Sequence, residues 1–211
     1  MANTFTPFGF LQDFGGSGGA PTFAQSERKI ASGDSQACYF GDPVFPVLTS
    51  ATGYVTQAHT PGTTVIAGIF VGCKYLSTSQ KRVVWNRYWP GADATGDVTA
   101  YVIDDPNAQF LVQASGASFY NASWTATTMT SLPIGQYAQF SIGTGNTSTG
   151  QSGAYISSVD TTVTFPFIIR GLYGAPPGAN GTNYATDYPY YVVGFNNEIL
   201  RTNGAGPTGI S

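Results

Sequence analysis

"TTVIAGIFVGCKYL", residues 63 to 76, is the longest apolar run in the chain. It is rich in β-branched and aromatic residues, and Gly68 and Gly72 interrupt it, so it suits a buried strand with a bulge better than a helix. Similar short runs recur along the chain, and roughly ten to twelve candidate strands can be counted at the spacing of an all-β sandwich or barrel. Only "DSQACYF", residues 34 to 40, is expected to form a single helical turn. The sequence therefore predicts an all-β fold, a barrel or a jelly-roll-like sandwich.

The chain is expected to form one main domain with extended appendages. Its 211 residues suffice for one sizeable core and do not require two domains. We predict an extended N-terminal arm at 1 to 22, a single β domain at 23 to 203 and a flexible C-terminal tail at 204 to 211. The segment 176 to 189 is rich in proline, glycine and asparagine and is expected to be a long loop.

The predicted arm carries four phenylalanines that precede or adjoin the glycine-rich stretch "GGSGGAP". Glycine and proline make an independent fold here improbable, and exposed phenylalanines are costly in water. We expect the arm to dock into grooves on the rest of the molecule, on a neighbouring subunit or on another protein. The candidate contact residues are Phe5, Phe8, Phe10 and Phe14.

Charge is sparse, which limits the classes of partner. Charged residues make up 9% of the chain and the net charge is −3, whereas an average soluble domain is about 25% charged. Half of the cationic residues lie in "KYLSTSQKRVVWNR", namely Lys74, Lys81, Arg82 and Arg87. A solvated hairpin rim or a contact to an acidic partner is favoured over a nucleic-acid patch. No apolar stretch approaches the roughly 18 residues of a membrane span.

Signals for catalysis are weak. Cys38 and Cys73 have no zinc-site spacing and are expected to be buried free thiols. "GGSGG" matches a nucleophile-elbow pattern but lacks the strand and helix that the elbow requires. His59, the only histidine, precedes a Thr-Pro-Gly turn and is expected to lie in a surface loop. We therefore expect no enzyme activity, no cofactor and no metal. The start of the chain does not read as a signal peptide, which favours synthesis in a cytoplasm.

Two adjacent carboxylates, Asp104 and Asp105, stand in "VTAYVIDDPNAQFLVQ", residues 98 to 113. Neighbouring residues of an extended chain point to opposite faces, so these two acids are poorly placed to share one reacting atom. Asp105, Pro106 and Asn107 instead predict a turn, flanked by the two arms of a hairpin. Asp104 is expected at a strand end, paired with a cation or a neighbouring subunit. In the second arm one face is formed by Phe110, Val112 and Ala114.

Seven segments, in this order, resemble small structural proteins of tailed bacteriophages. The likeness spans about residues 27 to 203, and the chain looks like a capsid decoration, or cement, protein. The segments are "GDPV" (41 to 44), "AGIFVGCKY" (67 to 75), "RYWPG" (87 to 91), "VTAYVIDDPNAQFLVQA" (98 to 114), "GNTSTGQSGAYISS" (145 to 158), "FPFIIRGLYGAPP" (165 to 177) and "VVGFNNEIL" (192 to 200).

This resemblance implies binding without chemistry. Cement proteins bind the outside of an icosahedral shell as oligomers and stabilise it, so the implied partners are the major capsid protein and other copies of this chain, with a trimer favoured over a dimer. The implied location is the outer capsid surface of a virion assembled in a host cytoplasm, without direct nucleic-acid or membrane contact. Besides the arm, the candidate contacts are Arg87, Tyr88 and Trp89.

Two other classes of function stay open at this point. The many aromatic residues could stack on sugars, as in a carbohydrate-binding module or a tail-associated lectin of a phage. An enzyme acting on polysaccharide would instead need two carboxylates facing each other across a cleft.

Overall fold

The computed structural model describes residues 4–14, 24–47, 53–57, 65–115, 134–173 and 188–200. Within these ranges the protein is all-β, as predicted, with no helix and with fourteen strands. The strands are β1 (Leu11–Phe14), β2 (Ser26–Ile30), β3 (Cys38–Tyr39), β4 (Pro43–Pro46), β5 (Val55–Thr56), β6 (Gly68–Leu76), β7 (Val83–Asn86), β8 (Tyr88–Trp89), β9 (Val98–Ile103), β10 (Gln109–Gln113), β11 (Tyr137–Ser141), β12 (Tyr155–Asp160), β13 (Phe167–Leu172) and β14 (Tyr190–Phe195).

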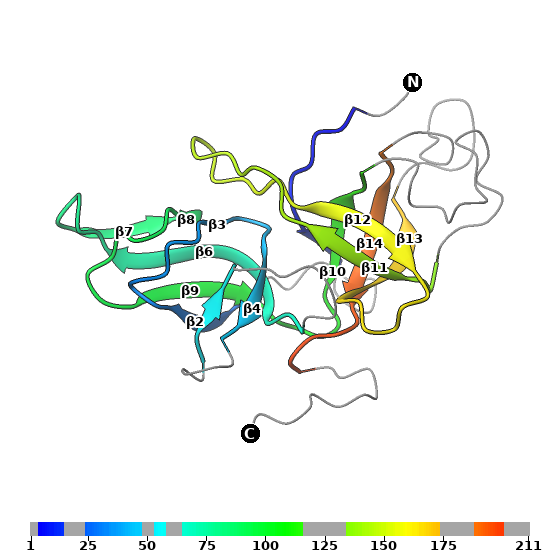
Figure 1. Ribbon diagram of the computed structural model, residues 1–211, viewed down its shortest axis with the longest axis horizontal. Helices are drawn as coiled ribbons and strands as arrows, with labels where there is room; N and C mark the ends of the chain where they lie inside the picture. Colours follow the sequence, from blue (N-terminus) through cyan, green and yellow to red (C-terminus); the bar gives the residue numbers. More distant parts are fainter. Residues whose placement is uncertain are drawn as a thin grey trace.

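The strands form two main units that lie side by side (Figure 1). One is a nearly closed antiparallel barrel in the order β2-β9-β6-β4-β5, with β7 paired to the far part of β6. The backbone N–H of Lys29 in β2 donates to the carbonyl oxygen of Gly53 beside β5, at 3.3 Å, and this bond brings the two ends of the barrel together. The other unit is an antiparallel six-stranded sheet in the order β1-β10-β14-β13-β11-β12.

The apolar first half of β6 is explained by burial on both of its faces. Ile69 packs into the core of the sheet, whereas its neighbour Phe70 packs into the core of the barrel. Successive side chains of a strand point to opposite faces, so a strand between two cores is apolar at almost every position. The predicted bulge is confirmed: the register of β6 against β9 shifts between Phe70 and Gly72.

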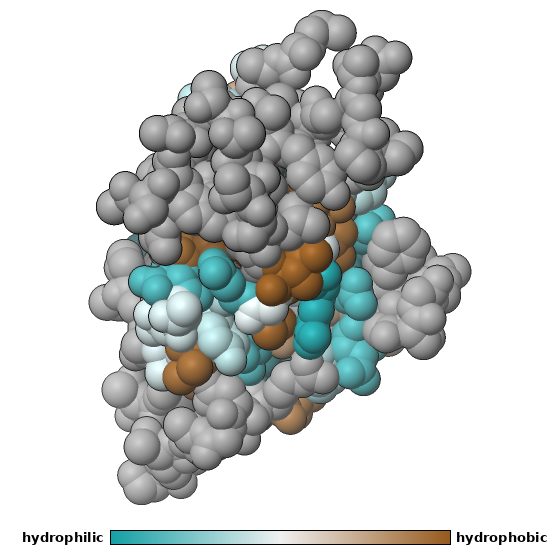
Figure 2. All heavy atoms as spheres, turned by 90° about the vertical axis from the view of Figure 1, so that its right-hand side faces the viewer, coloured by the Kyte–Doolittle hydropathy of each residue, from teal (hydrophilic) through white to brown (hydrophobic). Residues whose placement is uncertain are grey.

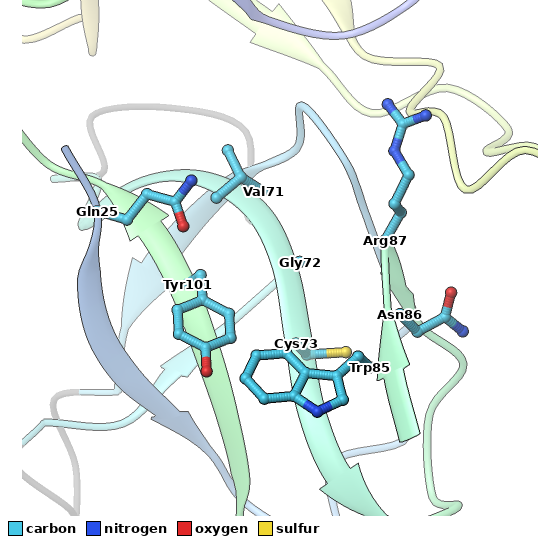
Figure 3. A pocket seen from close by; sticks show the side chains of 8 residues that line it. All are labelled: Gln25, Val71, Gly72, Cys73, Trp85, Asn86, Arg87 and Tyr101. Atoms are coloured by element: carbon cyan, nitrogen blue, oxygen red, sulfur yellow. The ribbon is translucent and has the colours of Figure 1, made fainter. Parts of the chain in front are cut away.

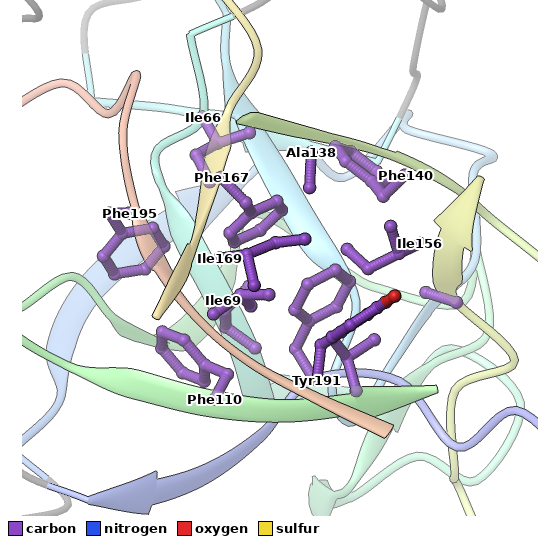
Figure 4. Packing of buried hydrophobic residues seen from close by; sticks show 14 of the residues in the cluster. Ile66, Ile69, Phe110, Ala138, Phe140, Ile156, Phe167, Ile169, Tyr191 and Phe195 are labelled. Atoms are coloured by element: carbon purple, nitrogen blue, oxygen red, sulfur yellow. The ribbon is translucent and has the colours of Figure 1, made fainter. Parts of the chain in front are cut away.

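The sheet side of the molecule holds the larger core. Aromatic rings dominate it, and Figure 4 shows them converging between the sheet and the strands that reach over from the barrel. Phe110 lies 5.1 Å from Phe195 in an edge-to-face arrangement, and Phe195 stacks on Phe167 at 6.0 Å between ring centroids. Val112 and Ala114 are fully buried in the same cluster, so the predicted apolar face of residues 110 to 114 is confirmed.

The turn predicted at 105 to 107 is confirmed, but the hairpin around it is wrong. The Asn107 N–H donates to the Asp105 carboxylate at 2.9 Å, and the Ala108 N–H donates to the Asp105 carbonyl at 2.9 Å. However, β9 pairs with β2 and β6 in the barrel, while β10 pairs with β1 and β14 in the sheet. The turn therefore passes the chain from one unit to the other. Its two flanks have period-two patterns because each faces a core, not because they face each other.

Asp104 is paired as predicted. Its Oδ2 accepts a hydrogen bond from Nη2 of Arg28 at 2.6 Å, and its Oδ1 accepts one from the Ser26 hydroxyl at 2.7 Å. Both partners lie on β2, so this cluster attaches the first strand of the barrel to the end of β9.

The helical turn predicted at 34 to 40 is wrong. Cys38 and Tyr39 form β3, which pairs with β8, and the Tyr39 ring stacks on Tyr88 at 5.5 Å. Pairing with β8, about fifty residues later in the chain, outweighs the local tendency of this segment to form a helical turn. The predicted tail at 204 to 211, most of the predicted long loop at 176 to 189 and His59 lie outside the described residues.

Candidate interaction surfaces

Residue Asp42, in the segment "GDPV", lies at a junction between the two units. Its side chain is buried, and its carboxylate accepts hydrogen bonds from the Ser152 hydroxyl at 2.5 Å and from the Tyr39 N–H at 2.8 Å. Burial raises the pKa of Asp42 to about 6, although both hydrogen bonds favour the charged form. The carboxylate holds backbone segments together, which is a structural role.

The segment "RYWPG" contributes one exposed and two packed side chains. Trp89 is fully buried in the barrel core, edge-on to Tyr75 at 5.0 Å. Tyr88 is half-buried against Tyr39, as described above. Arg87 is exposed, and its guanidinium lies 4.3 Å above the ring of Phe40. Of the three predicted contact residues here, Arg87 is therefore the most accessible to a partner.

Residues 4 to 14 of the arm lie on the chain's own sheet, as the blue trace in Figure 1 shows. The side-chain amide of Gln113 anchors this segment: its Oε1 accepts a bond from the Thr6 N–H, and its Nε2 donates to the Thr4 carbonyl, both at 2.8 Å. Further along, β1 pairs with β10 as an edge strand, and Phe14 is its last residue. Phe10 is 2% exposed, so it belongs to the sheet core.

The start of the arm carries aromatic side chains that are only partly covered. Phe5 is 37% exposed and lies edge-on to Tyr155 at 5.1 Å and 5.2 Å from Tyr188. Phe8 is half-buried and stacks on Tyr190 at 5.9 Å. We call these five residues the arm cluster. It is formed by the arm together with β12, β14 and the residues just before β14.

Other exposed apolar side chains lie at the ends of the sheet strands. Ile134 precedes β11, Val163 lies between β12 and β13, and Tyr173 follows β13; they are 52%, 52% and 45% exposed. Val163 lies before the start of β13, whereas Ile134 and Tyr173 lie near its other end, so the three side chains do not form one patch. Figure 2 views the molecule from the right-hand side of Figure 1 and shows hydrophobic residues in the middle of that face, with polar residues to both sides.

A second aromatic site lies on the outer face of the barrel. Trp85 on β7 is 65% exposed, and its ring is within 7° of parallel to that of Tyr101 on β9, with 5.7 Å between centroids. The Lys74 ammonium lies 4.8 Å from the centre of the Trp85 ring. A shallow cavity of about 620 Å³ adjoins both rings; its other lining residues are Gln25, Val71, Gly72, Cys73, Asn86 and Arg87 (Figure 3).

Trp85 and Tyr101 were not among the residues singled out as contacts from the sequence. A signal was nevertheless present in "RVVWNRYWP", because alternation along a strand places Val83, Trp85 and Arg87 on one face. All three are exposed, as are Lys74, Lys81 and Arg82. The four basic residues are therefore exposed on the β6–β7 hairpin or directly after it.

Both cysteines are free and buried, as expected. Burial raises the pKa of Cys73 to about 12, so its thiol stays protonated, and the thiol lies 3.5 Å from the Tyr88 carbonyl oxygen. Within the described ranges, no group of three or more histidine, cysteine or acidic side chains could hold a metal ion. The same part of the chain contains no helix long and apolar enough to cross a membrane.

Comparison with known proteins returns no match: neither a family model, nor a curated protein, nor a solved structure is significantly similar to this chain.

Proposed function

We propose that this chain is a non-enzymatic virion structural protein that binds the outside of an icosahedral bacteriophage capsid as an oligomer and stabilises it. The observation that carries the proposal is the arm cluster, an aromatic surface that the chain builds by folding its own N-terminal segment onto the sheet. The ordered resemblance of residues 27 to 203 to phage decoration proteins supplies the identity of the partner, the major capsid protein.

The arm cluster has the composition of a protein interface. Aromatic residues are enriched at the centres of such interfaces, and charged residues are depleted there. Phe5 is accessible while its backbone neighbours Thr4 and Thr6 are bonded to Gln113, so the ring is presented in a fixed position. A side chain that is ordered before binding loses little conformational entropy when a partner covers it.

Low charge also favours binding over a large area. With only 9% charged residues, a broad surface can be buried without removing many ions from water. A decoration protein also gains from symmetry, since an oligomer that contacts several capsid subunits multiplies weak contacts through effective concentration. A stable contact of this type would bury about 1,600 Å² in total.

The adjacent acidic residues Asp104 and Asp105, together with the buried Asp42, have structural roles. Asp104 is bonded to Arg28, and Asp105 closes a turn with Asn107. Asp42 is buried behind Ser152 and Tyr39. These carboxylates stabilise the fold, which favours a binding role over polysaccharide hydrolysis.

Co-sedimentation with purified capsid shells tests the proposal. We expect the protein to pellet with shells and Phe5→Ala to weaken this binding at least ~10-fold, because an interface aromatic can contribute 2 kcal/mol or more. Val83→Ala is the matched control, since Val83 is an exposed apolar residue on the barrel and outside the arm cluster. Failure of the unmodified protein to bind shells would overturn the proposal.

A further inference from the structure

The outer face of the barrel carries a second surface whose form the proposed function does not explain. Trp85 exposes 65% of its surface, although the barrel already has a closed core beneath it. Two more exposed apolar residues, Leu76 and Val83, face each other across the β6–β7 hairpin. Scattered exposed apolar residues are ordinary, but a large aromatic ring grouped with others on one strand pair indicates a binding surface.

The local sequence positions the two rings side by side. Lys74 on β6 lies opposite Trp85 on β7, and Gly72 on β6 lies opposite Tyr101 on β9. Since Gly72 has no side chain, both rings can lean over β6 from either side. In Figure 3 both rings are seen face-on and next to each other. Their planes differ by 7° and their centroids are 5.7 Å apart in a stacked arrangement, so the two rings are parallel and offset, and Trp85 presents the exposed aromatic face.

The Lys74 ammonium stabilises this arrangement. It lies 4.8 Å from the centre of the Trp85 ring, within the range of a cation–π contact. The contact favours the side-chain rotamer that keeps the indole flat over the strand. The lysine stem is flexible and exposed, so it can move aside when a ligand covers the ring.

A polar group borders the aromatic surface. The amide of Gln25 lines the same cavity, and Figure 3 shows it near Tyr101, whereas the side chains of Asn86 and Arg87 point away from the rings. Asn86 is hydrogen-bonded to Tyr75, and the Arg87 guanidinium lies over the ring of Phe40. An amide both donates and accepts hydrogen bonds. A ligand that fits this site has an apolar face and hydrogen-bonding groups around its edge.

Pyranose sugars have this form, because their axial C–H groups make an apolar face and their hydroxyls project from the rim. We propose that the barrel face is a saccharide-binding site. In this site the exposed Trp85 ring stacks on a sugar ring of an uncharged oligosaccharide, Tyr101 holds the indole in place as its stacking partner, and Gln25 binds sugar hydroxyls.

A single-stranded nucleic acid is the competing ligand, because bases also stack on aromatic rings and Lys74 and Arg87 are nearby. Charge favours the saccharide. The neighbouring cations Lys29 and Arg28 are matched by Asp97, at 4.0 Å, and Asp104, at 2.6 Å. Glu27 lies opposite Tyr101 across the β2–β9 pair, and the whole chain has a net charge of −3. A phosphate backbone would meet acidic groups close to the stacking surface.

Binding to cellohexaose, maltohexaose and chitohexaose, measured by titration calorimetry with the full chain, tests the site. We expect at least one of them to bind, Trp85→Ala to weaken that binding at least ~10-fold, and Trp85→Phe to retain part of it. The matched control is Leu200→Ala, which removes an exposed apolar side chain that follows β14 and lies outside the cavity lining, and it should bind as the unmodified protein does.

The thermal midpoint of Trp85→Ala should match that of the unmodified protein within a few degrees, so a loss of binding cannot be attributed to unfolding. The proposal is overturned if none of the three oligosaccharides binds at millimolar concentration, or if Trp85→Ala binds them as tightly as the unmodified protein. It is also overturned if Trp85 is needed only for binding an oligothymidylate. It does not depend on capsid binding, which is measured separately with shells.

Discussion

Truncation of Phe10 to alanine measures how far the N-terminal arm is part of the fold. Phe10 is 2% exposed, stacks on Phe167 at 4.4 Å and meets Phe140 edge-on at 6.0 Å. Its flanking backbone is also bonded inward, since the Gly9 N–H donates to Ala154 at 3.1 Å and the Phe10 N–H donates to Gly41 at 2.9 Å. The ring therefore lies within the core that the sheet and the barrel strands share.

Removing a buried phenylalanine side chain from such a site costs about 3 to 5 kcal/mol, from lost apolar burial and the cavity that remains. This is a large share of the roughly 5 to 15 kcal/mol by which a domain is stable. We expect Phe10→Ala to lower the free energy of unfolding by that amount, measured by guanidinium denaturation followed by circular dichroism. Phe5→Ala is the matched control in the same arm: its ring is 37% exposed, so the loss should not exceed about 1.5 kcal/mol. Equal, small effects of both changes would refute the placement of the arm in the core.

Two further changes test the junctions between the two units, and a third tests the packing of two neighbouring barrel strands. Asp105→Ala should lower the free energy of unfolding by about 0.5 to 2 kcal/mol, because the Asn107 N–H loses its side-chain acceptor; an unchanged denaturation midpoint would contradict this role. The pKa of the Asp42 carboxyl is about 6 in the folded protein, against an ordinary value of 3.8. The folded state therefore binds a proton at this carboxyl more tightly than the unfolded state does. The contribution of Asp42 to stability should be greatest below pH 4 and should fall by up to about 3 kcal/mol as pH rises to above 6. The difference in unfolding free energy between the unmodified protein and Asp42→Asn, measured at pH 4 and pH 7, should show this fall, and a constant difference would argue against it. Gly68→Ala should cost about 1 to 3 kcal/mol, because φ is +138° and a Cβ would collide with the Ile103 carbonyl oxygen; denaturation that matches the unmodified protein would disprove the close approach of β6 and β9.

Much of the strand pattern could be predicted because it depends on local alternation. Within the predicted run, residues 68 to 76 form a strand with a bulge, and residues 105 to 107 form the turn that aspartate, proline and asparagine favour. Pairing could not be predicted, since it depends on contacts between distant segments. The DDPN turn was expected to join a hairpin, yet it joins two sheets, and Cys38–Tyr39 becomes a strand only because Tyr88–Trp89 lies beside it.

The same limit applies to the candidate sites. The sequence predicts Phe5, Phe8 and Phe10 equally as contact residues. In the structure Phe10 is buried in the core, whereas Phe5 is accessible. In "RYWPG", the tryptophan is a core residue, whereas the more exposed Trp85 lies four positions earlier. The parallel arrangement of Trp85 and Tyr101 requires β6 to lie between β7 and β9, and no spacing within the sequence encodes that order.

Thermal stability of purified empty capsid shells, measured by scanning calorimetry with and without the full chain, tests the proposed function most directly. We predict that the protein binds the shells and that their disruption temperature rises until the binding sites are saturated. Shells that neither bind the protein nor change their disruption temperature would contradict a capsid-stabilising role.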